Sequence, residues 1–162
     1  MELQVELRVV GQVALAMLLG GAIGLEREYA HRPAGLRTHM LLSGASALLV
    51  GLAFTIVRRL GGATQYPLLK IDPTIVIQAI VTAVGFIGAG TILRHPGGDH
   101  IEGLTTAVSL LLVAAIGSCV ALGQVALAAG VTLLALATLY GVQRVEAKIH
   151  KGKAPSPGPD AP

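Results

Sequence analysis

Two polar segments hold most of the side chains in this sequence that could do chemistry. The first runs from Gly24 to His39 and the second from Arg94 to Thr106, and each lies directly against apolar sequence. The candidate site residues in them are Glu26, Arg27, Glu28, Arg32, Pro33, Gly35, Arg37, Thr38, His39, Arg94, Thr105 and Thr106. Interfacial salt bridges that fix helix ends explain this pattern, and so does a site for an ion, a phosphate or a partner.

A magnesium site is one reading of these carboxylates. Mg²⁺ keeps much of its hydration shell and needs only one or two carboxylates, so Glu26, Glu28 and Glu102 are candidate ligands. The neighbouring arginines argue against a bare cation and suit an anion or a phosphate equally well. No His/Cys spacing supports zinc, and no cofactor other than Mg²⁺ is expected.

Local chemistry predicts how the first segment folds. If the first helix continues through Arg32, then Glu28 and Arg32 form an i,i+4 ion pair in the favourable order. Pro33 and Gly35 then turn the chain. Thr38 is expected to cap the helix that follows.

A third motif is the glycine-rich stretch Gly85, Gly88 and Gly90, followed by Thr91. Each glycine weakens a helix by about 1 kcal/mol relative to alanine. Close helix packing accounts for the motif, and so does a local break that exposes backbone groups to an ion or solute. It is not a nucleotide fingerprint, because no strand precedes it.

The composition indicates that these motifs sit in a membrane protein. Of 162 residues, 53% are hydrophobic and 13% are charged, about half the charge of an average soluble domain. Disorder is excluded, because it requires low hydrophobicity. The net charge is +3, yet five aromatic residues and no tryptophan offer no stacking platform for nucleic acid. A lipid bilayer is therefore the expected surrounding.

Intervals without charge predict the spans, since about 20 helical residues cross a bilayer core. The expected fold is all-α, a polytopic bundle of five transmembrane helices at about residues 9–25, 40–57, 73–93, 104–121 and 125–143. Together, residues 1–143 form the transmembrane domain. Residues 144–162 are expected to form a basic, proline-rich and mostly disordered cytoplasmic tail.

The basic residues predict the orientation. Eight lie in the 26–39 loop, the 94–102 loop and the tail, and four lie in the segments of the other side. The positive-inside rule then places the N-terminus outside and the C-terminus in the cytoplasm. The first span is expected to be retained, because Glu2 and Glu6 do not suit a signal peptide.

Small residues predict how the spans pack. They recur every four residues in the first span (Ala16, Gly20, Gly24) and in the second (Ser43, Ala47, Gly51). Such stripes allow close helix contact, within one chain or in a homo-oligomer. Asp72 before Pro73 is expected to cap the third span. No hydrolytic or nucleotide motif is present, so no enzyme activity is expected.

Both segments resemble a known family. Gly-Leu-Glu-Arg-Glu with Arg-Pro-Ala-Gly-Leu-Arg-Thr-His (24–28 and 32–39) is similar to the signature of the MgtC/SapB family. Gly-Phe-Ile-Gly-Ala-Gly-Thr-Ile-Leu-Arg (85–94) and Gly-Leu-Thr-Thr-Ala (103–107) match its second block. There are two departures. Only the proline-rich tail stands where well-studied members carry a soluble C-terminal domain, and Glu102 stands where a basic residue is expected.

The resemblance implies a multi-pass protein of the bacterial inner membrane, associated with magnesium homeostasis and, in pathogens, with virulence. It implies regulation through contacts with other membrane proteins. The alternative is a transporter or channel for Mg²⁺ or another cation. That alternative is weakened because the spans carry no charge near mid-membrane, where ion-coupled carriers place ionisable residues.

Overall fold

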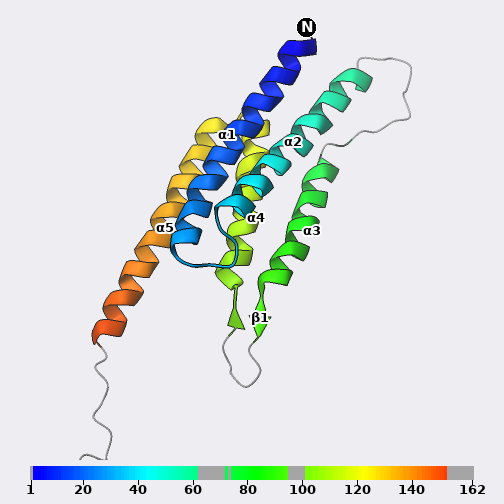
Figure 1. Ribbon diagram of the computed structural model, residues 1–162. Coiled ribbons are helices and arrows are strands. Elements are labelled where there is room, and N and C mark those ends of the chain that lie inside the picture. Colours follow the sequence, from blue (N-terminus) through cyan, green and yellow to red (C-terminus); the bar gives the residue numbers. More distant parts are fainter. Residues whose placement is uncertain (1, 62–71, 73, 95–100, 153–162) are drawn as a thin grey trace, which may run out of the picture.

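The computed structural model describes residues 2–61, 72, 74–94 and 101–152, which form five helices and one short hairpin (Figure 1). The helices are α1 (Glu2–Tyr29), α2 (Leu36–Gly61), α3 (Thr74–Thr91), α4 (Leu104–Ala121) and α5 (Val125–Gly152). Strands β1 (Leu93–Arg94) and β2 (Ile101–Glu102) pair antiparallel between α3 and α4. The expected five-helix, all-α bundle is confirmed, with this hairpin as a small addition.

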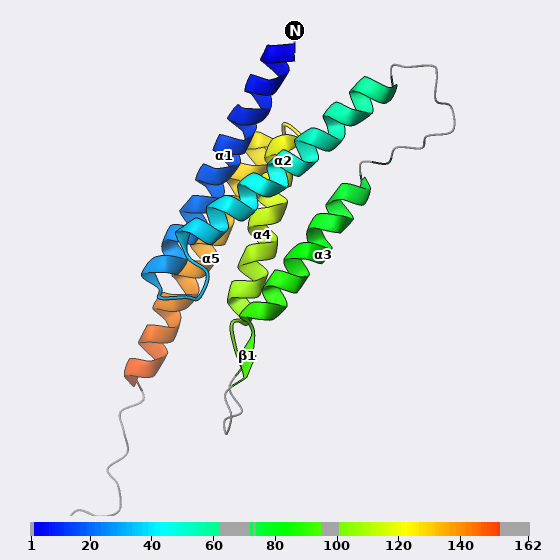
Figure 2. The same cartoon turned by 45° about the vertical axis from the view of Figure 1, so that its right-hand side comes forward.

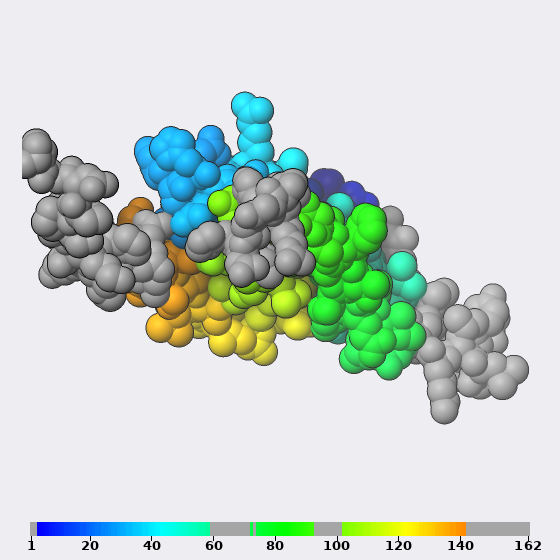
Figure 3. Space-filling model, turned by 90° about the horizontal axis from the view of Figure 1, so that it is seen from below, coloured from blue at the N-terminus to red at the C-terminus, as the bar shows by residue number. Residues whose placement is uncertain are grey.

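Helix α4 is the centre of the bundle. It contacts each of the other four helices, and half of its apolar segment is buried. Helices α3 and α5 lie on opposite sides of it, as Figure 2 shows and as Figure 3 shows from below. Helix α3 is the most peripheral of the candidate spans, since only 17% of its apolar segment is buried.

The length and composition of the helices indicate a membrane. Four of them could cross a bilayer: Leu3–Tyr29, Leu36–Arg58, Thr74–Thr91 and Leu104–Ala121. In α5, the described apolar stretch Val125–Gly141 rises about 25 Å, slightly less than a bilayer core. Large apolar side chains face outward from the bundle, including Phe86 at 84% and Leu134 at 69% exposure. The chain is therefore a multi-pass membrane protein.

The last helix is longer than expected. Helix α5 runs on to Gly152, past the expected boundary at 143. Residues 144–152 contain no proline and include the good helix formers Arg, Glu, Ala and Lys, so the helix continues. The remainder of the expected tail, residues 153–162, lies outside the described residues.

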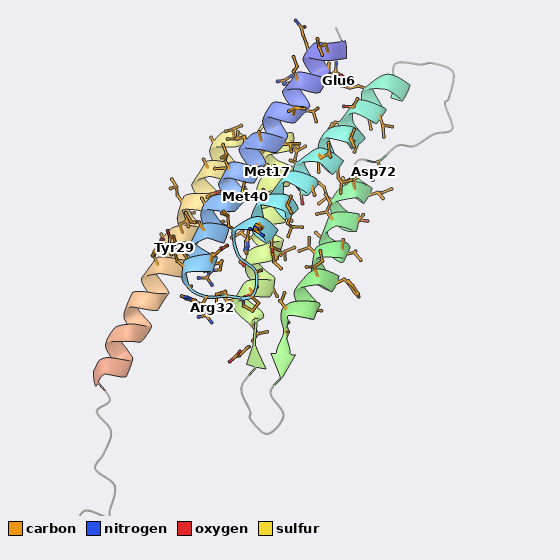
Figure 4. The ribbon with its side chains drawn as sticks, viewed as in Figure 1. Glu6, Met17, Tyr29, Arg32, Met40 and Asp72 are labelled. Atoms are coloured by element: carbon orange, nitrogen blue, oxygen red, sulfur yellow. The ribbon has the colours of Figure 1, made fainter. Side chains whose placement is uncertain are left out.

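Three helices cross closely at Ser43. A Cβ on Gly20 of α1 would lie 2.6 Å from the Ser43 Cβ, and a Cβ on Gly117 of α4 would lie 2.1 Å from the Ser43 carbonyl oxygen. Glycine is thus required at both positions. The expected packing role of the first two stripes agrees with this crossing. Met17 and Met40 fill the space beside it, between α1 and α2 (Figure 4).

Helix α3 begins at an aspartate cap. The Asp72 Oδ1 atom accepts a hydrogen bond from the Thr74 amide at 2.9 Å, as expected for a cap. Hydrogen bonds from the side chain and the amide of Thr74 hold the pKa of the exposed Asp72 carboxyl below its usual value. Figure 4 shows Asp72 at the start of α3.

Candidate functional site

The candidate site lies at one end of the bundle, here called the mouth. The mouth comprises the α1–α2 turn, the β1–β2 hairpin and the first turns of α2 and α4. Figure 1 shows these parts together at the lower end, opposite the N-terminus of α1. The two polar segments of the sequence therefore meet at the same end.

Helix α1 ends before Arg32, contrary to expectation. His31 takes a left-handed conformation with φ 53°, and the Arg32 amide donates to the Arg27 carbonyl at 3.0 Å. The His31 amide also donates to the Glu28 carbonyl, which completes a Schellman motif. The predicted i,i+4 geometry for Glu28 and Arg32 is wrong, because Arg32 lies outside the helix. Figure 4 shows Tyr29 and Arg32 at this turn.

Glu28 binds the start of α2 instead. Its Oε2 accepts a hydrogen bond from the Leu36 amide at 2.8 Å. A carboxylate at a helix N-terminus satisfies a free amide and interacts favourably with the helix dipole. A Cβ on Gly35 would lie 2.6 Å from this Oε2, so the turn requires glycine there. The expected cap by Thr38 is wrong, since Thr38 lies inside the first turn and is exposed.

Glu26 and Arg27 form a buried ion pair. The Arg27 Nε lies 2.5 Å from Glu26 Oε2, and Arg27 Nη2 lies 2.8 Å from Glu26 Oε1. Both residues are only 2% exposed. Two parallel N–H···O contacts to one carboxylate are the strong, bidentate form of this interaction. The pair is neutral as a unit, so charge is buried here together with its partner.

His39 joins the two polar segments. It is fully buried, its Nδ1 lies 2.9 Å from the Gly35 carbonyl oxygen, and its Nε2 lies 3.0 Å from Ser109 Oγ on α4. The Ser109 hydroxyl also lies 2.8 Å from the Thr106 carbonyl oxygen. A carbonyl only accepts, so Nδ1 carries a proton. When the ring is neutral, Nε2 is an acceptor, so the single Ser109 hydroxyl proton can be donated either to His39 Nε2 or to the Thr106 carbonyl oxygen.

The second segment holds α3 against α4. Gly103 has φ 92°, and a Cβ there would lie 2.0 Å from the Thr91 carbonyl oxygen, so only glycine fits. The Thr91 hydroxyl donates to the Gly88 carbonyl at 2.7 Å. Thr106 is buried, whereas Thr105 is exposed. The backbone of Arg94 pairs with Ile101, and its side chain lies outside the described parts.

The glycine-rich stretch does not break its helix. Helix α3 runs without interruption to Thr91, which contradicts the expected alternative of a local break. Gly88 packs on Ala107, where a Cβ would come within 3.3 Å. Gly85 and Gly90 face open space, with nothing within 4 Å of an added Cβ. Packing inside this chain therefore explains only one of the three glycines.

The candidate metal ligands do not converge. Glu26 is held by Arg27, Glu28 by the Leu36 amide, and Glu102 is exposed on β2. No group of three His, Cys, Asp or Glu side chains suited to a metal occurs within the residues that the structure describes. The other candidates Arg32, Pro33 and Arg37 are exposed around this end.

Two residues of the site, Ser109 and Gly117, carry no signal in the sequence pattern. Ser109 lies in an apolar segment where no motif marks it, although it bonds to His39. Gly117 belongs to neither of the small-residue stripes described above, although it sets the approach of α4 to α2. Both contacts join positions about 70 residues apart, and local spacing along the chain carries no signal for such contacts.

Sequence comparison relates the chain to known proteins. The model of the MgtC family matches residues 13–148. The "Putative magnesium transporter YhiD" of Escherichia coli K12 is 42% identical over 115 residues, which cover 70% of this chain and 50% of that protein. Protein SrpB of Synechococcus elongatus is 34% identical over 141 residues, covering 83% of this chain and 75% of SrpB.

A third relative is Protein MgtC of Brucella abortus, 37% identical over 125 residues, which cover 77% of this chain and 47% of that protein. The chain thus spans about half the length of the YhiD and MgtC relatives that it matches. No solved structure matches it. The family model covers most of the chain, including the Glu26–Arg27 pair and His39, and the chain therefore belongs to the MgtC family.

Proposed function

We propose that this chain is a bacterial inner-membrane protein of magnesium homeostasis that regulates other membrane proteins by direct contact. The link to magnesium rests on the names of its relatives, one of them the "Putative magnesium transporter YhiD". The proposed orientation has the mouth in the cytoplasm, following the distribution of basic residues. The proposed role involves no catalysis and no bound cofactor.

The contacts of Glu26 and Glu28 at the mouth are the observation that favours regulation over transport. Both oxygens of Glu26 contact Arg27, and Glu28 accepts from the Leu36 amide. A cation that entered at the mouth would have to displace these donors before it gained an oxygen of Glu26 or Glu28 as a ligand. Breaking a buried ion pair is costly, because one charge is left without its partner. The geometry favours a closed, structural mouth.

The surface of α3 supports a contact role. Phe86 is 84% exposed, and the open positions Gly85 and Gly90 lie on the same helix. Small residues at a helix surface allow another helix to approach closely in a membrane. A bulky aromatic beside them offers additional contact area. Another membrane protein is the proposed occupant, and self-association through this face is an outcome that co-purification would reveal.

Flux measurement separates regulation from the alternative, direct transport of Mg²⁺ or another cation. The purified chain is reconstituted in liposomes that contain a Mg²⁺-sensitive dye, together with Glu26→Gln and the matched variant Glu6→Gln at the opposite end. Regulation predicts a dye response equal to that of empty liposomes for all three proteins. A response that wild type and Glu6→Gln give and Glu26→Gln lacks would establish transport and contradict our proposal.

Co-purification tests the contact role itself. The tagged chain is isolated in mild detergent from cells grown at low Mg²⁺, and its membrane partners are quantified by mass spectrometry. Phe86→Ala is expected to reduce a specific partner severalfold. The matched variant Leu134→Ala, on the exposed surface of α5, is expected to leave that partner unchanged. Equal recovery of every membrane protein with both variants would contradict binding through α3.

A further inference from the structure

The bundle has a second polar site at the end opposite the mouth. There α1 and α2 diverge, as Figures 1 and 2 show, and a cavity of about 250 Å³ opens between them and the α4–α5 turn. We call this cavity the fork pocket. Its polar lining comes from Arg8, Gln12, Thr55 and Arg58, and its apolar lining includes Phe54 and Leu122.

The two arginines of the fork pocket have no acidic partner in the described part of the chain. Among the described residues, no carboxylate forms an ion pair with either guanidinium. Arg58 stands in the last turns of α2, where the helix dipole favours a cation. Arg8 stands near the N-terminal end of α1, where the dipole gives a cation no stabilisation. The dipoles therefore do not explain both arginines.

The negative end of α4 is also already occupied. The Gln12 Nε2 atom donates to the Val120 and Ala121 carbonyl oxygens at 3.2 and 3.1 Å. The Val120 carbonyl also accepts from the Gly123 amide at 3.0 Å. Without Gln12, the Ala121 carbonyl would attract a guanidinium, since the last carbonyls of a helix lack intrahelical partners. With Gln12 bound to them, Arg8 and Arg58 remain available for an anion that enters from outside the chain.

The pocket lies at the depth of lipid phosphates. Arg8 precedes Arg27 by a rise of about 28 Å along α1, and Arg58 follows Arg37 by about 32 Å along α2. These rises match a bilayer core of about 30 Å, so all four arginines mark its two boundaries. A lipid phosphate lies just beyond the hydrocarbon boundary and thus at the level of Arg8 and Arg58.

An apolar groove continues from the pocket. It encloses about 390 Å³, shares Val5, Val9 and Thr55 with the fork pocket, and is completed by side chains such as Leu52 and Ile56. Glu6 is the one acid that lines it, and it belongs to the groove rather than to the pocket. A hydrocarbon chain fits the apolar part, while a free anion would leave it empty.

We propose that the fork pocket binds the phosphate of an anionic phospholipid, with an acyl chain of the same lipid in the adjoining groove. Arginine suits phosphate because its planar guanidinium makes two parallel hydrogen bonds to it. Basic pockets between transmembrane helices bind lipid headgroups in this way. The bound lipid would fill the fork and hold α1 and α2 at their present separation.

Native mass spectrometry of the full, delipidated chain in detergent tests this directly. It is titrated with palmitoyl-oleoyl-phosphatidylglycerol, with the zwitterionic phosphatidylcholine of the same acyl chains, and with inorganic phosphate. We expect phosphatidylglycerol to bind about tenfold more tightly than phosphatidylcholine, and inorganic phosphate to bind weakly. Equal affinity for the two lipids would overturn the proposal. Inorganic phosphate as strong as phosphatidylglycerol would identify a site for free phosphate instead.

Variants locate the binding. Arg8→Gln and Arg58→Gln are each expected to weaken phosphatidylglycerol binding about tenfold, whereas Arg37→Gln, which removes an exposed arginine at the mouth, changes it less than about twofold. Gly51→Leu keeps both arginines and fills the fork, and it is also expected to weaken binding. An equal loss in Arg37→Gln would contradict the site. Circular dichroism checks folding, and the wild-type comparison of lipids stands without any variant.

Discussion

The two ends of the α1–α2 pair treat charge in opposite ways. At the mouth, Arg27 is 2% exposed and lies on the carboxylate of Glu26. At the fork, Arg8 and Arg58 are exposed and line an open cavity. The same residue type therefore closes one end of the bundle as part of a neutral pair and leaves the other end open to an anion. An arginine that is buried with a carboxylate stabilises the fold, whereas an exposed arginine without one is available to bind a ligand.

Removal of an arginine should show the largest difference between the ends. Arg27→Met leaves the Glu26 carboxylate buried without the guanidinium that contacts both of its oxygens, and it is expected to cost about 3–5 kcal/mol of stability. Arg8→Met removes an exposed charge and should change stability by less than about 0.5 kcal/mol. Thermal unfolding in detergent measures both. Similar losses in the two variants would show that the ends are not different in this respect.

Glycine substitution tests the convergence of the helices. Gly117→Ala places a Cβ 2.1 Å from a backbone oxygen, which cannot move cheaply, so we expect a loss of about 3 kcal/mol. Gly51→Ala at the fork meets Val9 Cγ1 at 3.4 Å, an ordinary contact, and should be nearly neutral. Chemical unfolding of both variants checks this. A stable Gly117→Ala protein would disprove the close crossing at Ser43.

Carboxylate removal has a smaller effect. Glu28→Ala frees the Leu36 amide at the start of α2 and is expected to cost about 1 kcal/mol, the typical value of a helix cap. Glu6→Ala, with an exposed carboxylate at the fork end, serves as the control and should cost less. Hydrogen exchange at the Leu36 amide gives a local readout. Unchanged protection of that amide in Glu28→Ala would argue against the bond.

The smallest effect is a pH dependence at Asp72. Its pKa is lowered in the folded chain, so its contribution to stability is present above the ordinary pKa of 3.8 and is lost as the pH falls below that value. Asp72→Asn keeps a capping oxygen and removes the charge. The difference in melting temperature between wild type and this variant should therefore shrink from pH 7 to pH 3. A difference that grows on acidification would have the wrong sign.

Much of the fold could be predicted because the bilayer imposes simple rules. Uncharged intervals located the five helices, the last two by division of the long interval 103–143 near Gly123, and Asp72 before Pro73 located a cap. The mouth was less predictable. A helix through Arg32 was a reasonable expectation from spacing, but a left-handed His31 ends α1 earlier. That conformation follows from the backbone bonds of the turn, which side-chain patterns do not reveal.

The remaining features that the sequence does not predict depend on contacts between residues far apart in the chain. The bond between His39 and Ser109 depends on the crossing of α2 and α4. That crossing requires glycines, such as Gly117, whose role becomes visible only when the helices are seen packed together. For the same reason, the sequence pattern does not predict the fork pocket. Arg8 and Arg58 stand at ends of different helices, and only the divergence of those helices makes them the walls of one cavity.

The closed mouth depends most on Glu26 and Arg27 acting as one neutral buried unit, and a double-mutant cycle tests this most directly. Unfolding free energies are compared for wild type, Glu26→Gln, Arg27→Met and the double variant. We predict a coupling on the order of 1–3 kcal/mol, with the double variant more stable than the sum of the single losses implies. Additive losses would mean that the two side chains act independently, and the closed mouth would be contradicted.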